Sequence, residues 1–306
     1  MTKLNRKDLI SISELSIEEV QLILNETETL KKGPRNTTHL AGKTLAMIFE
    51  KSSTRTRVSF ETGIYQLGGI GMFFSPKDLQ MGRGETIHDT AKVLSRFVNG
   101  IMARTFSHQT VLDLAKYATV PVINGLTDFD HPCQALCDIF TVYEKRGKLK
   151  GLTMAYIGDG NNVLHSLIQA CVKVGMNINY ASPIGYKPLQ WVVDEALEVA
   201  KVTGSKIKSK ENAFDAIADA DVIYTDVWVS MGQEEENEKR KKDLKDFQLN
   251  GELMKKAKKN VLVMHCLPAH RGEEITDEVI DGPNSIVFDQ AENRMHVQKA
   301  IMKLLM

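Results

Sequence analysis

The sequence predicts an α/β protein made of two doubly wound parallel-sheet domains linked by helices. Apolar, strand-like runs alternate with amphipathic, helix-like segments almost throughout the 306 residues. Strand and helix in strict rotation favour parallel sheets covered on both faces. A basic turn, KRGKLKG, separates two such series, and the length suits about two domain cores. We therefore expect a first domain over 1–147, rejoined by a final helix at 291–306, and a second over 148–290.

The first series begins with a helix near 16–32. Apolar runs such as KTLAMIFE predict buried strands at 43–49, 70–74, 99–103 and 119–123. Helical periodicity predicts the segments between and after them, at 55–67, 86–98, 107–117 and 132–147.

The second series predicts strands near 153–158, 177–181, 221–225, 261–264 and 285–288, with helices between them and a last helix over 291–305. Residues 230–247, SMGQEEENEKRKKDLKDF, break this rhythm with an acidic block followed by a basic one. Such dense charge predicts a solvated loop or a mobile helix. A long polar excursion after a strand end is also a common design for a lid.

Composition excludes several classes of protein. Lys+Arg and Asp+Glu are both 39, so no net field attracts nucleic acid or a membrane surface. Four cysteines are too few for a disulfide scaffold and lack the paired spacing of a zinc site. The chain has no signal-peptide core and no apolar run of membrane-spanning length, so we expect a cytoplasmic protein.

The stretch SSTRTR at 52–57 predicts a phosphate site. It follows a buried strand and opens a helix, where a capping role explains one or two hydroxyls. Capping does not explain Arg55 and Arg57, because the helix dipole disfavours cations in the first turn. An anion held by the helix N-terminus and the guanidinium groups would reverse that penalty.

Other strand ends of the first half carry polar groups. Arg104 ends the strand VNGIMAR, and alone it is a weak signal, since a terminal arginine is usually solvated. His131 precedes Pro132 at a helix start, with Gln134 facing the same opening. A capping histidine is the simpler interpretation; the alternative is a neutral imidazole that donates to a carbonyl oxygen.

In the second half, GDGNN resembles the start of a dinucleotide fingerprint, but Val163 stands where its third glycine belongs. The turn instead presents Asn161 and Asn162, amides that suit a zwitterionic amino acid. Asp226 ends another strand, with Ser230 and Met231 beyond it. His265 and Cys266 end a third strand, but adjacent strand residues point to opposite faces, which argues against a Cys–His dyad.

The set SSTRTR, MARTF, HPCQALCD, GDGNN, DVWVSMG, HCLPAHRG and AENR resembles, in order and spacing, the ornithine carbamoyltransferase family. The resemblance runs from residue 43 to the last helix. It implies transfer of the carbamoyl group of carbamoyl phosphate to the side-chain amine of L-ornithine, giving citrulline and phosphate, in arginine biosynthesis or the arginine deiminase pathway. DVWVSMG separates it from aspartate carbamoyltransferase, which shares the STRTR-like and HPxQ elements.

The resemblance also implies the site residues. Carbamoyl phosphate would contact Ser53, Thr54, Arg55, Thr56, Gln80, Arg104, His131 and Gln134, with Cys266, Leu267 and Arg294 closing the site. The ornithine site would comprise Asn162, Asp226, Ser230 and Met231. Arg104, His131 and Cys266 would be the catalytic residues, Cys266 without becoming a covalent nucleophile. No metal or organic cofactor is expected.

Two further features follow from the resemblance. A cis peptide bond is implied before Pro268. Gln80 matches a loop that in this family reaches into a neighbouring subunit's site, which implies a homotrimer with shared sites.

Other functions remain open from the residues alone. The acceptor could be putrescine or an acylated ornithine, although putrescine has no carboxylate for the SMG element to bind. A nicotinamide-dependent oxidoreductase would use GDGNN but leave SSTRTR and Arg104 unexplained. A two-lobed amino-acid-binding protein would need no phosphate site.

Overall fold

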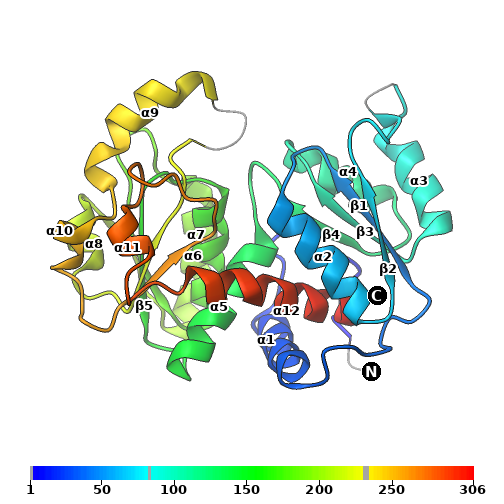
Figure 1. Cartoon of the computed structure of the whole chain (residues 1–306), viewed down its shortest axis with the longest axis horizontal. Helices are drawn as coiled ribbons and strands as arrows, with labels where there is room; N and C mark the ends of the chain where they lie inside the picture. The colour runs from blue at the N-terminus through cyan, green and yellow to red at the C-terminus, as the bar shows by residue number, and fades with distance from the viewer. Residues whose placement is uncertain (1–2, 82–83, 230–233) are drawn as a thin grey trace. The chain divides into compact units, whose positions relative to one another are not determined.

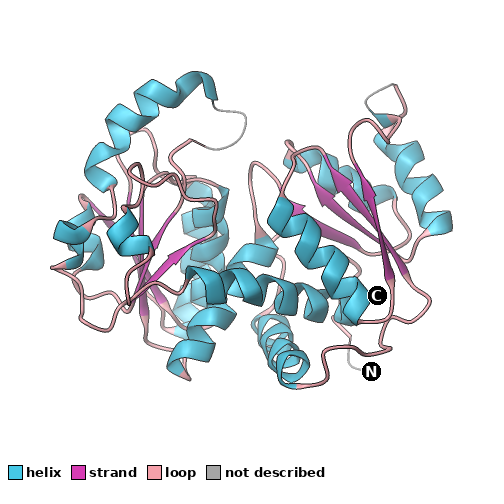
Figure 2. Cartoon of the chain, in the orientation of Figure 1, coloured by secondary structure: helices cyan, strands magenta, loops and turns pink. Residues whose placement is uncertain are grey.

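The computed structural model describes residues 3–81, 84–229 and 234–306 (Figure 1). The chain forms two compact units, Met1–Phe140 with Glu292–Met306, and Thr141–Ala291. Each holds one parallel sheet with helices around it, as Figure 2 shows, which confirms the predicted fold class. The units divide inside a helix, at 140/141, where the sequence prediction sets the boundary after 147.

The sheet of the first unit has four parallel strands in the order β2-β1-β3-β4. Their bounds are β1 Thr44–Phe49, β2 Ile70–Phe74, β3 Gly100–Arg104 and β4 Val122–Leu126. The central strands are almost wholly buried because helices cover the sheet, so their sequences are nearly unbroken apolar runs. The edge strand β2 is instead a mixture of exposed and half-buried residues.

Four helices of the first unit, α1 to α4, begin where the sequence supplies a capping side chain. Ser16 and Glu19 form a reciprocal capping box at the first of them, and Ser53, Thr86 and Ser107 each accept a backbone N–H at later ones. The bounds are α1 Ile17–Lys32, α2 Thr54–Gln66, α3 Ile87–Phe97, α4 His108–Tyr117, α5 Pro132–Arg146 and α12 Val287–Leu305, the last two shared with the second unit.

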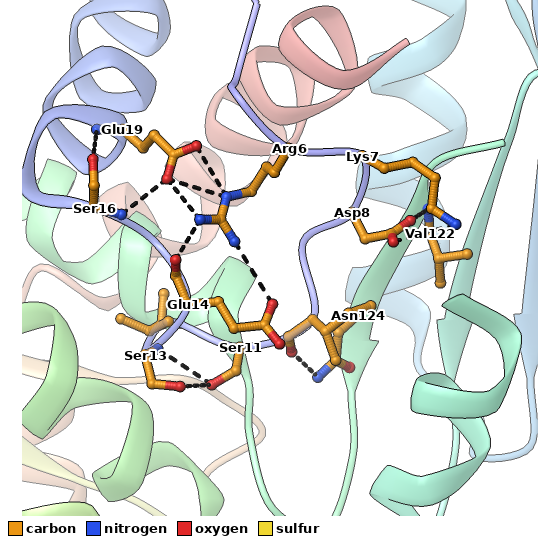
Figure 3. A network of polar contacts seen from close by, with 12 residues as sticks. Arg6, Lys7, Asp8, Ser11, Ser13, Glu14, Ser16, Glu19, Val122 and Asn124 are labelled. Carbon is orange, nitrogen blue, oxygen red and sulfur yellow. Dashed lines mark hydrogen bonds and ion pairs between the residues drawn. The ribbon is translucent and has the colours of Figure 1, made fainter. Parts of the chain in front are cut away.

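An N-terminal strap, defined here as residues 6–12, covers the outer edge of β4. Leu9 makes a parallel bridge to Ile123, with its N–H bonded to the Val122 carbonyl at 2.9 Å. Figure 3 shows how side chains fix the strap: Asp8 accepts the Val122 N–H, and Arg6 pairs with Glu19 of α1. Such a cover satisfies backbone groups that an open sheet edge would leave exposed.

The sheet of the second unit has five parallel strands in the order β7-β6-β5-β8-β9. The strands are β5 Thr153–Ile157, β6 Asn177–Ala181, β7 Ile207–Lys210, β8 Val222–Thr225 and β9 Leu262–His265. The helices are α6 Asn162–Lys173, α7 Gln190–Thr203, α8 Ala213–Ile217, α9 Asn237–Leu244, α10 Gly251–Met254 and α11 Asp277–Ile280. Because β5, β8 and β9 are neighbours, the polar residues after their carboxyl ends share one edge of the sheet.

Two strand predictions are wrong in detail, and one strand was not predicted. The run at 285–288 is not a strand: Ser285 makes only an isolated bridge to Val263, and α12 begins at Val287. β7 was missed because it is an edge strand with little apolar sequence. β4 begins at Val122 and not at 119, which fits the lack of a backbone N–H in Pro121 just before it.

The charged segment is helical where it is described. A 3-10 turn at Glu234–Glu236 leads into α9. The prediction of a solvated loop or mobile helix does not hold at Arg240, which is buried and pairs with Asp159 at 2.9 Å. Residues 230–233 lie outside the described residues.

Gly160 lies where a loop passes over the GDGNN turn, and Gly160→Ala is expected to destabilise the second unit by about 2–3 kcal/mol. A Cβ there would lie 2.3 Å from the Pro188 nitrogen and 2.5 Å from the Lys187 carbonyl carbon. Urea unfolding followed by tryptophan fluorescence measures the loss, because Trp191 and Trp228 both belong to this unit.

The matched control is Gly185→Ala. Gly185 has φ +91° but open space around its Cβ position, so the substitution costs only backbone strain, about 1 kcal/mol. Equal losses in the two variants would contradict the close approach.

Candidate functional site

The predicted phosphate-binding residues of SSTRTR lie where β1 ends and α2 begins. Ser53 caps this helix: its hydroxyl accepts the Thr56 N–H at 3.2 Å and lies 3.1 Å from the Thr56 hydroxyl. The cap thus accounts for Ser53, as helix chemistry alone predicts. Thr54 is exposed and Arg55 half-buried in the first turn, where backbone N–H groups and the helix dipole favour an anion.

Arg294 ties three helices together within the first unit. From α12, its guanidinium donates to the Thr56 hydroxyl of α2 at 3.1 Å and to the Gln134 carbonyl oxygen of α5. Gln134 in turn donates its amide nitrogen to Asp138 at 2.7 Å. An ionised carboxylate accepts hydrogen bonds and cannot donate them, so Asp138 must face the NH₂ group of Gln134. This fixes the orientation of the Gln134 amide, whose oxygen then faces Arg294. All four side chains are buried.

His131 lies against the same positive charges. Burial, together with the charges of Arg294 and Arg104, holds the pKa of His131 well below its ordinary value. Arg104 ends β3 opposite Phe49 of β1, and it is buried as well. The imidazole is therefore neutral at physiological pH and keeps one ring N–H that can donate to an oxygen.

Two cations near SSTRTR differ from the sequence interpretation. Arg57, one of the two arginines that indicated phosphate, pairs with Glu61 at 3.2 Å and stacks on the Phe73 ring, 3.8 Å from its centroid. Its role is thus explained without a ligand. Lys51, which the sequence reasoning missed, is buried before the helix with its ammonium 4.5 Å from the Phe106 ring centroid.

The half of the site in the second unit centres on Asp226, a buried carboxylate at the end of β8. One oxygen accepts the Asn161 amide at 2.7 Å; the other accepts the Cys266 thiol at 2.9 Å and the Val227 N–H at 2.8 Å. Asn161 is oriented by capping α6, where its oxygen accepts the Val163 N–H at 2.9 Å. A carboxylate offers about four acceptor positions, so Asp226 retains capacity for an ammonium group.

A second buried carboxylate, Asp159, lies in the GDGNN turn and is neutralised within the unit. It pairs with Arg240 of α9 at 2.9 Å, and Arg240 also donates to the Trp228 carbonyl at 3.3 Å. Burial raises the pKa of Asp159, while the Arg240 charge opposes the rise and the Asp226 charge adds to it. Arg240 thus neutralises Asp159, whereas the donors described above for Asp226, the Asn161 amide, the Cys266 thiol and the Val227 N–H, are neutral.

The turn after β9 is held by His265. The Leu267 N–H donates to Nδ1 at 2.9 Å, so the neutral ring carries its proton on Nε2 and donates to Glu274 at 3.0 Å. The Leu267–Pro268 peptide bond is cis, as the resemblance implied, and Leu267 has φ +56°. Cys266 instead bonds Asp226, which agrees with the argument against a Cys–His dyad.

Asp226, His265 and Cys266 also offer ligand atoms within 4.8 Å of one another. A metal ion there would have to replace the bonds of the His265 ring and the Cys266 thiol just described.

The remaining predicted residues divide into three groups. Asn162 is half-buried in the first turn of α6, beside Asn161, whose amide is the one bonded to Asp226. Gln80 is exposed in the loop after the edge strand β2, outside the buried cluster around Arg294. Ser230 and Met231 lie outside the described residues, so the structure gives no account of them.

Two family models match successive parts of the chain, and the second match includes residues 292–305, which belong to the first compact unit in the structure. A family model described as the carbamoyl-P binding domain of aspartate/ornithine carbamoyltransferase matches residues 7–144, and one described as its Asp/Orn binding domain matches 150–305. The chain belongs to the aspartate/ornithine carbamoyltransferase family.

Individual members of this carbamoyltransferase family are similar over nearly the whole chain. The ornithine carbamoyltransferase of Thermococcus kodakarensis is 56% identical over 303 residues, 98% of this chain and 96% of that protein. That of Anoxybacillus flavithermus is 55% identical over 307 residues, 99% and 98% of the two chains. The solved ornithine carbamoyltransferase of Pyrococcus furiosus has a TM-score of 0.96 at 52% identity, covering 100% of this chain and 99% of its own.

In this carbamoyltransferase, the free energy of unfolding is expected to rise less steeply between pH 5 and 6.5 in His131→Gln than in the wild type. Below about pH 6.5 an unfolded histidine binds a proton, whereas folded His131 stays neutral, so wild-type stability falls as the pH is lowered. The contribution reaches up to about 1.4 kcal/mol per pH unit. Urea unfolding at several pH values, followed by circular dichroism, measures it.

His88→Gln, at an exposed histidine, controls for the loss of any imidazole. If His131→Gln kept the wild-type slope, His131 would be protonated in the folded chain and the neutral-donor assignment would be wrong.

Proposed function

We propose that this chain transfers the carbamoyl group of carbamoyl phosphate to the side-chain amine of L-ornithine, giving L-citrulline and phosphate. The observation that carries the proposal is Asp226, a buried carboxylate with spare acceptor capacity in the unit that matches the Asp/Orn binding domain. The names of relatives at 52–56% identity support it.

Carbamoyl phosphate is assigned to the first unit because its buried charges are positive. Arg104 and Arg294 are both buried, and Arg294 is held by the neutral groups Thr56 and Gln134, so its charge can serve a bound anion. The N-terminus of α2 adds further donors for phosphate. Ser53, Thr54 and Arg55 contribute through this first turn in the proposal.

The acceptor amine is assigned to the second unit because Asp226 selects for an ammonium group. Ornithine carries two amines and one carboxylate, whereas aspartate carries a second carboxylate that a buried Asp226 would repel. Asp226 can hold the α-ammonium, and Asn162 with residues 230–231 is proposed to receive the α-carboxylate. The side-chain amine is then left for the reaction.

The chemical step requires the neutral side-chain amine to attack the carbamoyl carbon. A C–N bond forms, the bond from that carbon to the phosphate oxygen breaks, and the departing phosphate can accept the proton that the nitrogen loses. Negative charge develops on the carbonyl oxygen, where Arg104, neutral His131 and the Thr56 hydroxyl are proposed donors. One such donor is worth about 3 kcal/mol. In this step Cys266, Leu267, Gln80 and Gln134 orient substrate and form no covalent bond with it.

Two variants test the assignment of each substrate to its unit. Asp226→Asn is expected to raise the KM for ornithine about 10- to 100-fold and to change the KM for carbamoyl phosphate little, because a hydrogen bond to a charged group is lost. Arg55→Ala is expected to do the reverse. Citrulline formation measured against each substrate in turn separates the effects.

Each variant is the other's control, since both must fold to show a selective change. Wild-type transfer to putrescine or aspartate as readily as to ornithine would refute the acceptor assignment. Equal losses for both substrates in either variant would refute the division between units.

We also propose that the chain acts as a homotrimer with shared sites. Elements α2, β2 and α3 carry six exposed large apolar side chains: Val58, Tyr65, Ile70, Met72, Val93 and Phe97. Exposed apolar surface of this kind marks association sites, and β2 is an open sheet edge followed by the Gln80 loop.

Light scattering is expected to give a particle about three times the mass of the 34.2 kDa chain. Phe97→Glu, at the most exposed of these six side chains, should lower that mass, because it places a charge in the proposed association surface. Val202→Glu, at an exposed apolar residue of the second unit, should not. A monomeric wild type would refute the assembly.

The cytoplasm is the proposed compartment. The four cysteines, all within the described residues, form no disulfide bond, which suits a reducing environment. Within residues 3–81, 84–229 and 234–306, no helix is long and apolar enough to cross a membrane.

A further inference from the structure

The N-terminal strap continues beyond β4 to the loop that carries His131. Its backbone pairs with β4 through the Leu9 carbonyl, which accepts the Asn124 N–H at 2.8 Å, and the Asn124 amide donates to the Ile10 carbonyl at 2.8 Å. Ile12, the next residue but one, donates its N–H to the carboxylate of Asp130 at 3.2 Å. The strap therefore contacts both the strand and the residue immediately before His131.

Asp130 is held at its backbone as well as at its side chain. Its carbonyl accepts the Thr127 N–H at 3.0 Å, and its N–H donates to the Thr127 hydroxyl at 3.1 Å. The same hydroxyl lies 2.9 Å from Nδ1 of His108 at the start of α4. Asp130 itself is only 3% exposed, so few alternative positions are open to it.

The position of Asp130 is transmitted to two residues proposed to contact carbamoyl phosphate. His131 follows directly, and its carbonyl accepts the N–H groups of Gln134 at 3.0 Å and Ala135 at 3.2 Å, which opens α5. A shift of Asp130 thus moves the imidazole and the first turn bearing Gln134 together.

We propose that Asp130 is a positioning residue for His131, and that the strap sets its place through the Ile12 N–H. This rests on the proposed function, since it assigns the strap a part in carbamoyl transfer although its residues are remote in sequence from every substrate-contacting residue. The proposed action of Asp130 is positional, through the backbone that it shares with His131 and through its bond to the Ile12 N–H.

The strap is rigid enough for this role because both its sides are anchored. Arg6 donates to Glu19 at 2.8 and 3.0 Å, and Glu19 also accepts the Ser16 N–H in the capping box of α1 (Figure 3). On the other side, the Lys7 ammonium donates to the carbonyls of Ala115 and Ala118 at the end of α4, at 2.6 and 2.7 Å. These bonds join the strap to α1 and α4.

Three variants test the proposal. Asp130→Ala removes the acceptor of the Ile12 N–H. Asp130→Asn keeps an oxygen that can accept it. Asp8→Ala is the matched control: it removes an equivalent carboxylate bond of the same strap, to the Val122 N–H at 2.8 Å, remote from His131. Each is assayed for citrulline formation, thermal stability and the ring resonances of His131 in the ligand-free protein.

Asp130→Ala is expected to lower kcat and raise the KM for carbamoyl phosphate, so that kcat/KM falls about 10- to 100-fold, with the KM for ornithine unchanged and the His131 resonances displaced. Asp130→Asn should recover to within about threefold of wild type. Asp8→Ala should lose comparable stability while keeping wild-type kinetics and His131 resonances.

The proposal fails if Asp130→Ala and Asp8→Ala show the same kinetics and the same His131 resonances at similar stability, because the bond would then be merely structural. It also fails if Asp130→Asn is as impaired as Asp130→Ala. If wild type forms no citrulline, the proposed function fails, and the His131 resonances still decide whether Asp130 positions the ring.

Discussion

The first unit depends on Arg294, a buried cation that no carboxylate directly neutralises among the bonds described. Its partners Thr56 and Gln134 come from different helices, and Asp138 acts on it only through the Gln134 amide. Burying a charge costs free energy unless the charge is well hydrogen-bonded. The bonds to the Arg294 guanidinium therefore fix the first turns of α2 and α5, which carry Thr56 and Gln134. The cluster remains positive because the intermediary groups are neutral. Burial lowers the pKa of His131, and the charges of Arg294 and Arg104 lower it further.

The second unit buries negative charges, in contrast to the buried guanidinium of the first unit. Its strand ends bring two carboxylates, Asp159 and Asp226, to one sheet edge, where like charges repel. Arg240 neutralises the first, while Asn161 and Cys266 give the second only neutral donors. The two units therefore carry buried charges of opposite sign, each with spare bonding capacity. Carbamoyl phosphate, an anion, suits the positive charges of the first unit, and ornithine, which carries two ammonium groups, suits the carboxylate of the second.

The sequence predicted the fold class and most elements because buried parallel strands are apolar runs and their helices have clear caps. It failed where local pattern and context disagree: Val287 favours a strand by type but opens α12, and β7 has too little apolar sequence to be detected. Among the candidate site residues, Arg294 is hydrogen-bonded to Thr56 and Gln134, and Cys266 is hydrogen-bonded to Asp226.

Long-range partners could not be predicted. Nothing in the sequence around Arg240 indicates Asp159, 81 positions away, and nothing in Asn161 distinguishes it from Asn162 until the helix start is known. Likewise, Arg57 was interpreted as a phosphate ligand from its position in the first turn of a helix. Its stacking on Phe73 could not be predicted, because it depends on how α2 lies against β2. Charge patterns identify which chemistry is present, but the geometry decides which residue performs it.

The division of the chain has a consequence for biosynthesis. The first unit is discontinuous: it needs residues 292–306, which contain Arg294, to complete itself. A ribosome delivers residues 292–306 only after the whole second unit has been synthesised, so the earlier part of the first unit is made well before Arg294. A chain that stops before residue 292 therefore lacks the guanidinium that bonds Thr56 and Gln134, even if its second unit is intact.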